Sequence, residues 1–395
     1  MPISYRQNSF IQLLIMLFLT ELARGMFILS YLPGMPAVST HVTITIVSVA
    51  VTLHFVTDAV TNMFIGGIMK RFGAKKILAI SYALGFISFS LVLINESNVF
   101  YIIAAIMLGI AACPIWIITL SSIREDIRGK QMGIVYFIWM SGLLSGMVVM
   151  NILITIEARR FVIIFPIIFL VNFIILMFTK ISVVVDKTTG WKRQFTNMAI
   201  VMRAHIPVLP GIVLQALAVG MLIPILPSFI VREAGLLLTH YTIILAVAGG
   251  ICSIAIVSIG KVLDTFKFVV TQSIIVVGFI IFGVSILFIS GASGFFPIMG
   301  IALVLGLIYG VLLPSWNKFM ARRIHGQLKE ETWGFFNFVQ GIGTMLGPLL
   351  GGLLVGLTGE ILTTIYVTGI IFIALALFYI IYFVVDRSNR SKSHG

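Results

Sequence analysis

Phe18-Leu-Thr-Glu-Leu-Ala-Arg-Gly-Met26 is the stretch that decides the fold, because it places two charges inside an apolar run from Phe10 to Leu32. A run of about 20 apolar residues is long enough to span a bilayer as a helix. A charge at bilayer depth costs at least ~2.5–3.5 kcal/mol, so such side chains usually face a bundle interior or an aqueous cavity. Glu21 and Arg24 lie three residues apart and therefore share one helix face. The stretch predicts a membrane helix with a polar, inward-facing side.

The next apolar run carries a second polar stripe. His54, Asp58 and Asn62 follow one another at intervals of four residues, which also places them on one face of a helix. Two neighbouring membrane helices are therefore expected to point ionisable groups inward. We interpret this as the polar wall of a transport pathway.

The composition indicates a membrane protein that crosses the bilayer many times. Of the 395 residues, 60% are hydrophobic and 10% are charged, which excludes an ordinary soluble domain. Apolar runs of membrane-spanning length predict twelve helices, all in an all-α fold. Their expected ranges are 10–33, 43–68, 77–95, 98–121, 131–154, 161–184, 206–230, 237–260, 268–291, 295–315, 332–357 and 361–385.

The basic residues predict the orientation in the membrane. If the N-terminus is cytoplasmic, the inner segments hold 22 of the 26 lysines and arginines, and the exceptions are Arg24, Arg159, Arg160 and Arg232. Such a bias is typical of a cell-membrane protein with both termini in the cytoplasm. It accounts for the net charge of +13 without a nucleic-acid partner, through topology and attraction to an anionic leaflet.

The chain also repeats itself. The glycine-led, basic segment from Gly66 to Lys76 is echoed by Gly260–Lys267, and Pro114-Ile-Trp116 is echoed by Pro314-Ser-Trp316. We expect two six-helix bundles, residues 1–185 and 206–395, because internal repeats of this kind are common in transporters. Residues 186–205 are the predicted cytoplasmic linker, either an amphipathic helix on the inner membrane surface or a plain basic connection.

These motifs resemble those of the major facilitator superfamily. The Gly66–Lys76 segment is similar to the G-x-x-x-D-R-x-G-R-K signature between the second and third helices of that family, and the glycine-rich run Gly341–Gly352 is also typical of it. The resemblance implies twelve helices in two pseudo-symmetric halves, alternating access and a monomer. Lys70 stands where the signature has an aspartate that takes part in a cytoplasmic charge lock. Lys70, Arg71 and Asp264 are therefore expected to act in gating, although Lys70 and Arg71 could also serve orientation alone.

A narrower resemblance concerns the proton-coupled glycolipid flippases of lipoteichoic acid synthesis in Gram-positive bacteria. The similar strings are Glu21-Leu-Ala-Arg-Gly-Met26, Glu125–Gly133, Pro314–Arg322 and Glu331–Asn337. The resemblance implies that the chain moves diglucosyl-diacylglycerol from the inner to the outer leaflet, coupled to protons. The implied partners are the glycolipid, protons and the bilayer, together with the glycolipid synthase and the lipoteichoic acid polymerase. No metal and no cofactor other than the proton gradient is expected.

The candidate site residues follow from the polar side chains inside the predicted helices. Asp58, Glu21 and His54 are the proton-coupling candidates, and Asp58 is the best of them because within one turn only His54 could neutralise it. The substrate-binding candidates are Glu21, Arg24, Asn62, Trp116, Trp139, Gln215, Asn337 and Gln340. The second half is poorer in deep polar residues than the first, as expected if sugars bind in one half and acyl chains in the other.

Several alternatives stay open from the sequence. Glu21 and Arg24 could form a structural ion pair, His54 could be a proton relay or a partner of Asp58, and the tryptophans could be core residues. A proton-driven multidrug exporter of the same superfamily is the main alternative function, and a sugar importer is a weaker one. A membrane glycosyltransferase is disfavoured, because the short loops offer only the acidic pairs Glu125-Asp126 and Glu330-Glu331, so we expect no enzymatic activity.

Overall fold

The computed structural model describes residues 3–39, 41–123, 128–157, 160–181, 200, 202–203, 205–263, 265–321 and 329–392. The described part is almost entirely helical and contains no strand, as the sequence predicts. The chain divides into two compact units, Met1–Thr188 and Thr189–Gly395. Most of the predicted linker, residues 186–205, lies outside the described residues.

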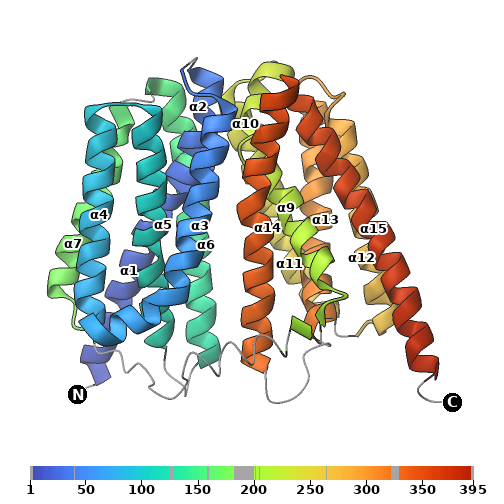
Figure 1. Ribbon diagram of the computed structural model, residues 1–395, viewed down its shortest axis with the longest axis horizontal. Coiled ribbons are helices and arrows are strands. Elements are labelled where there is room, and N and C mark those ends of the chain that lie inside the picture. Colours follow the sequence, from blue (N-terminus) through green and yellow to red (C-terminus); the bar gives the residue numbers. More distant parts are fainter. Residues whose placement is uncertain are drawn as a thin grey trace. The chain divides into compact units, whose positions relative to one another are not determined.

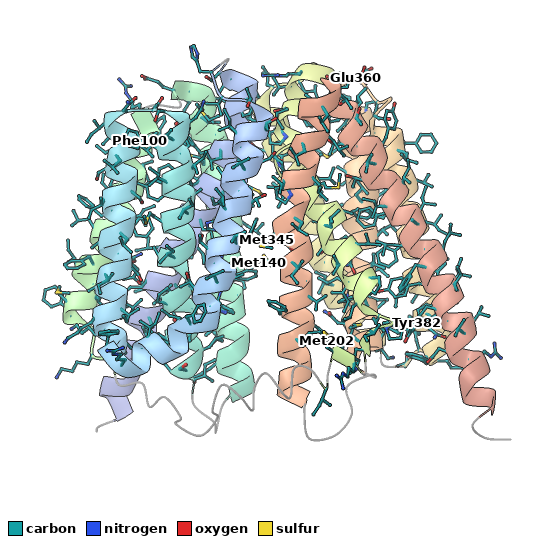
Figure 2. The ribbon with its side chains drawn as sticks, in the orientation of Figure 1. Phe100, Met140, Met202, Met345, Glu360 and Tyr382 are labelled. Carbon is teal, nitrogen blue, oxygen red and sulfur yellow. The ribbon has the colours of Figure 1, made fainter. Side chains whose placement is uncertain are left out.

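The helices of the first unit run alongside one another (Figure 1). They are α1 (Ile3–Met26), the π-helix η1 (Phe27–Tyr31), α2 (Leu32–Val38), α3 (Ile44–Phe72), α4 (Ala74–Ile94), α5 (Asn98–Ser121), α6 (Arg128–Glu157), the 3₁₀-helix η3 (Arg160–Ile163) and α7 (Ile164–Phe178). Thr43 and Ser97 begin α3 and α5 as N-caps, since their hydroxyls accept hydrogen bonds from the backbone amides of Ile46 and Phe100. Figure 2 labels Phe100 near this end of α5.

The second unit is built from a similar set of helices. They are α9 (Leu209–Leu222), α10 (Leu226–Ser228), the π-helix η4 (Phe229–Glu233), α11 (Leu238–Leu263), α12 (Phe268–Ile289), α13 (Phe295–Ala321), α14 (Lys329–Thr358) and α15 (Ile361–Lys392). Glu360 lies in the turn between α14 and α15, and Tyr382 lies on the later part of α15 (Figure 2).

The predicted membrane spans are confirmed. Within the described residues, eleven helices are long and apolar enough to cross a membrane, and a bent pair of helices makes twelve. The bent pair is the seventh predicted span, 206–230, which breaks between Leu222 and Leu226 with a bend of 41°. Pro224 and Pro227 lie at this break, and proline removes a helical hydrogen bond and clashes with the preceding turn.

Several further boundaries differ from the prediction. The helix of the sixth span ends at Phe178 and not at 184, and the helices of the tenth and twelfth spans extend to Ala321 and Lys392. The first span, predicted as a regular helix over 10–33, changes to a π-helix at Phe27–Tyr31 before α2 continues it.

The helix of the second span, α3, extends beyond residue 68 to Phe72, so Lys70 and Arg71 lie in this helix and not in a loop, although the apolar span within it ends at Asn62. Gly73 ends α3 with φ of 87°, a conformation that favours glycine, and α4 begins at the next residue.

The same helix pairings occur in each unit. In the first unit α1 packs against α6, α3 against α5 and α4 against α7. In the second unit α9 packs against α14, α11 against α13 and α12 against α15. These are equivalent pairs when the six spans of each unit are counted in order, as expected for a duplicated bundle.

Aromatic side chains fill the interior of both units. In the first unit the rings of Phe89 and Phe165 stack with their centroids 4.7 Å apart. In the second unit Trp316 Nε1 donates a hydrogen bond of 3.0 Å to the buried hydroxyl of Tyr379. Many large apolar side chains on the outside of the helices are exposed, for example Phe178 at 77%, as expected where a protein faces lipid.

Candidate functional site

Three charged side chains inside the first unit, those of Glu21, Arg24 and Asp58, form a cluster around Arg24. Its Nη1 atom lies 3.6 Å from Glu21 Oε1, and its Nη2 atom lies 3.3 Å from Asp58 Oδ2. The Glu21 side chain is 1% exposed, whereas those of Arg24 and Asp58 are 16% and 20% exposed. Arg24 and Glu21 are close in the sequence and lie on the same helix, α1. The contact between Arg24 and Asp58 joins α1 to α3 and depends on how these two helices pack.

His54 is the fourth member of this Arg24 cluster. Arg24 Nε donates a hydrogen bond of 3.0 Å to His54 Nε2, and His54 Nδ1 lies 3.1 Å from the carbonyl oxygen of Ala105 on α5. The ring is fully buried. The guanidinium carbon of Arg24 also lies 5.9 Å from the centre of the Phe55 ring, within cation–π distance.

The Arg24 cluster can change its charge by one proton. With Glu21 and Asp58 both ionised, the permanently charged Arg24 leaves one negative charge in excess. A proton on either carboxylate makes the cluster neutral, which greatly lowers the cost of keeping it at membrane depth. Among the described residues, Glu21 Oε2 has no hydrogen-bond partner although it is buried. The geometry therefore suits a site that takes up and releases a proton.

Asn62 extends the polar surface by one turn of α3. Its Nδ2 atom donates a hydrogen bond of 3.0 Å to the backbone carbonyl of Asp58, and its Oδ1 atom accepts one of 3.0 Å from the thiol of Cys113. The Asn62 side chain is exposed. The predicted stripe of α3 thus runs from the buried His54 to the exposed Asn62, and the thiol of Cys113 on α5 contacts its exposed end.

Glycines let the helices that carry the Arg24 cluster approach closely. A Cβ atom on Gly142 of α6 would lie 2.7 Å from the carbonyl oxygen of Phe18 and 3.1 Å from Glu21 Cβ. A Cβ atom on Gly109 of α5 would lie 2.5 Å from the carbonyl oxygen of His54. The packing of α6 on α1 and of α5 on α3 therefore fixes the positions of Glu21 and His54.

The predicted sugar-binding tryptophans are brought together. Trp116 on α5 and Trp139 on α6 lie with their ring centroids 5.9 Å apart at an angle of 49°. Both are half-buried, so each ring retains accessible surface. Aromatic faces suit the apolar faces of sugar rings, because each contact buries apolar area with little loss of side-chain freedom.

The candidate binding residues of the second unit are spread over two helices. Gln215 lies buried on α9, and its Oε1 atom has no hydrogen-bond partner among the described residues. Gln340 is exposed on α14. Asn337 also lies on α14, where its backbone is described.

The gating candidates are described in part. Arg71 is exposed, and its guanidinium carbon lies 5.3 Å from the centre of the Phe72 ring. Lys70 lies on α3, where its backbone is described, and Asp264 lies outside the described residues.

Lys75 makes a polar contact that sequence reasoning missed. Its Nζ atom donates hydrogen bonds of 3.0 and 3.1 Å to the carbonyl oxygens of Met177 and Thr179. A cation near the last carbonyl oxygens of a helix is a common C-terminal cap. Here the cation comes from α4, which is distant in the sequence from α7, the helix that it caps.

The described residues offer no group of three or more His, Cys, Asp and Glu side chains that could hold a metal ion.

The sequence is similar to known membrane transporters along almost its whole length. A sequence model of the family described as Major Facilitator Superfamily matches residues 13–343 and 208–395. The proton-coupled antiporter flippase LtaA of Staphylococcus epidermidis is 41% identical over 389 residues, which cover 98% of this chain and 97% of that protein. The protein of the same name from Staphylococcus aureus (strain USA300) is 42% identical over 383 residues, which cover 97% of this chain and 96% of that protein.

The fold is similar to solved transporter structures. The crystal structure of the nucleoside transporter NupG has a TM-score of 0.78 at 15% identity and covers 95% of this chain and 99% of that one. A bacterial homologue of the human lysosomal transporter Spinster has a TM-score of 0.64 at 13% identity, with 96% of each chain covered. At such low identity these similarities establish the fold and not the substrate.

Proposed function

Because the chain belongs to the major facilitator superfamily, we propose that it is a proton-coupled antiporter that flips a glycolipid between the leaflets of the cell membrane. The substrate we propose is diglucosyl-diacylglycerol, moved from the inner to the outer leaflet for lipoteichoic acid assembly. Outward movement of the lipid is coupled to inward movement of protons by alternating access.

The observation that carries this proposal is the 41–42% identity to two staphylococcal proton-coupled antiporter flippases. The similarity covers 97–98% of this chain, so it includes both six-helix units. The buried Arg24 cluster supports the coupling, since it gives the first unit a group of charges that one proton neutralises.

We propose Asp58 and Glu21 as the proton-coupling residues. When Asp58 is ionised, its contact with Arg24 at 3.3 Å is a charge pair that stabilises this arrangement of α1 and α3. A proton on Asp58 would cancel that attraction and change which conformation has the lower free energy. Glu21 would respond in the same way through its contact with Arg24 at 3.6 Å.

The substrate-binding proposal divides the lipid between the two units. Trp116 and Trp139 would contact sugar faces, while Arg24, Asn62 and the carboxylate of Glu21 would bind sugar hydroxyls. The more apolar second unit would receive the acyl chains, and Gln215, Asn337 and Gln340 would supply its polar contacts. Sugars need hydrogen bonds and aromatic faces, whereas acyl chains need apolar surface.

The remaining parts of the proposal concern topology and partners. Both termini would be cytoplasmic, residues 186–205 would be the linker between the bundles, and Lys70, Arg71 and Asp264 would act in gating at the cytoplasmic side. The chain would act as a monomer, without enzymatic activity or cofactor, and its product would pass to the enzymes that build lipoteichoic acid.

The proposal is tested by reconstituting the protein in proteoliposomes with fluorescently labelled diglucosyl-diacylglycerol. We expect protein-dependent flipping that accelerates when a pH gradient is imposed, and loss of this acceleration in the Asp58→Asn variant. A folded preparation that flips no glycolipid but expels a lipophilic cation would refute the proposal in favour of a multidrug exporter.

A further inference from the structure

The ring of His54 is held on both sides by groups that leave it little freedom. We propose that His54 is a positioning residue: as a neutral hydrogen-bond acceptor it holds Arg24 between the two carboxylates, and it does not carry the coupled proton. This inference rests on the proposed proton-coupled function and deepens it. It replaces the relay role that the spacing of His54 and Asp58 suggests.

The hydrogen-bond partners determine which nitrogen carries the proton. A guanidinium has only donors, so His54 Nε2, at 3.0 Å from Arg24 Nε, must accept. In a neutral imidazole the other nitrogen is then the N–H donor. His54 Nδ1 therefore donates to the carbonyl oxygen of Ala105, which lies 3.1 Å away.

The same geometry explains how Arg24 reaches two acids at once. Each of its three nitrogens faces a different acceptor: Nη1 faces Glu21 at 3.6 Å, Nη2 faces Asp58 at 3.3 Å and Nε faces His54 at 3.0 Å. Because the guanidinium is planar and rigid, the hydrogen bond at Nε together with the covalent bond to the side-chain stem restricts the directions of Nη1 and Nη2. The bond to His54 therefore restricts the angle at which Arg24 bridges the acids.

The surroundings of the ring oppose its protonation. From α1 the ring faces Arg24, whose charge is permanent, with Glu21 beyond it. From α5 it faces the Ala105 carbonyl, whose acceptor is already satisfied by the neutral ring. Asp58, one turn further along α3, is engaged by Arg24 Nη2. A second proton on His54 would set one donor against another at 3.0 Å and place a second cation, in a fully buried position, beside Arg24. The carboxylates are the better proton acceptors of the cluster.

The fold holds the ring in place from the α5 side. Gly109 lies one turn after Ala105 on α5, and a Cβ atom there would meet the side-chain oxygen of Thr57 and the carbonyl oxygen of His54. The α5 backbone can therefore lie directly against α3, which brings the Ala105 carbonyl within hydrogen-bond distance of the ring. A continuous path of hydrogen bonds therefore joins three helices: it runs from the Ala105 carbonyl on α5, through His54 on α3, to Arg24 on α1.

The test compares two substitutions at this position. In His54→Gln the side-chain oxygen can accept from Arg24 and the amide can donate to Ala105, but the side chain cannot carry a proton. His54→Leu removes both hydrogen bonds. The initial rate of flipping of labelled diglucosyl-diacylglycerol is measured in proteoliposomes over a series of pH values, with and without a pH gradient. His41→Gln is the matched control, because His41 is an exposed histidine in the connection between α2 and α3.

We expect His54→Gln to keep the midpoint of the pH profile and the ratio of gradient-driven to gradient-free flipping. The initial rate of flipping is expected to fall about tenfold or more in His54→Leu, because this variant loses a hydrogen bond to a charged group. Loss of gradient stimulation in His54→Gln, as in Asp58→Asn, would overturn the inference and make His54 the proton carrier. Wild-type behaviour of His54→Leu would overturn the positioning role.

A spectroscopic measurement tests the inference independently of transport. Nitrogen-15 NMR of the histidine-labelled protein, with the spectrum of His54→Gln subtracted, isolates one of the six histidine rings. We expect a neutral ring protonated at Nδ1 throughout the range from about pH 5 to 8. A ring that becomes doubly protonated in this range would overturn the inference even if flipping behaves as proposed. Failure of the wild type to flip glycolipid would instead refute the proposed function and leave this measurement to decide the role of His54.

Discussion

Replacement of Gly109 by alanine tests the close packing of α5 on α3 that supports the Arg24 cluster. The added Cβ atom would lie 2.5 Å from the carbonyl oxygen of His54, whereas ordinary van der Waals contact begins near 3.4 Å. One of the two backbones therefore has to withdraw by about 0.9 Å, the difference between these distances. The neighbouring atoms belong partly to the backbone, so they cannot rotate away as the end of a long side chain can.

The expected effect on stability follows from two opposing terms. Overpacking of a tight interior costs about 1–3 kcal/mol, while alanine gains about 1 kcal/mol over glycine in a helix. Because the contact is with backbone, we take the upper end of the first term and expect a net loss of about 2 kcal/mol. For a unit of 188 residues this corresponds to a fall of about 4–8 °C in the melting temperature.

The assay is thermal unfolding in lipid nanodiscs, followed by tryptophan fluorescence. Gly300→Ala is the matched control, because Gly300 lies in α13 with nothing within 4 Å of the position a Cβ atom would take. We expect this control to melt at the wild-type temperature or slightly above it. Gly109→Ala melting as high as the wild type would refute the close contact of α5 and α3. An equal fall in both variants would show that the loss is not specific to that contact.

Three further predictions concern contacts elsewhere in the chain. Lys75→Met should lower the melting temperature by a few degrees, because Lys75 donates to two carbonyl oxygens at the end of α7; the exposed Lys76→Met changes the charge equally, and an equal effect would contradict the capping role. Trp316→Phe and Tyr379→Phe should each cost about 1–3 kcal/mol through loss of a buried hydrogen bond, and strict additivity in the double variant would contradict their coupling. Glu21→Gln keeps the side-chain volume but cannot be ionised, so it should abolish gradient-stimulated flipping without lowering the melting temperature; retained stimulation would exclude Glu21 from the coupling.

Much of the fold could be predicted because membrane spans are marked by composition alone. Apolar runs of sufficient length identified the spans, and the intervals between Glu21 and Arg24 and along α3 identified the polar faces. These patterns do not show which helices pack against each other or how closely they approach. The contact of Arg24 with Asp58 depends on how α1 and α3 approach each other, and no interval in the sequence encodes that approach.

The boundaries that differed have local physical causes. The seventh span carries two prolines, and their effect could have been anticipated from the chemistry of that residue, although the bend angle could not. The π-helix at Phe27–Tyr31 contains no proline itself, but Pro33 and Pro36 follow it in α2. The pairing of Lys75 with the end of α7 joins residues about 100 positions apart and requires the folded bundle.

The π-helix at Phe27–Tyr31 has a consequence for labelling experiments on the first span. A π-helix forms i→i+5 hydrogen bonds, so one extra residue enters the turn and the positions beyond it are rotated by about one residue step. A scan in which successive residues are replaced by cysteine should therefore show reactivity with a period of 3.6 up to Met26 and resume it after Tyr31 out of phase. Within the described residues, no helix resumes directly after Phe229–Glu233, where the bent seventh span ends, so the shift is expected in the first span. A single helical wheel drawn through the first span would assign the residues after Tyr31 to the wrong face.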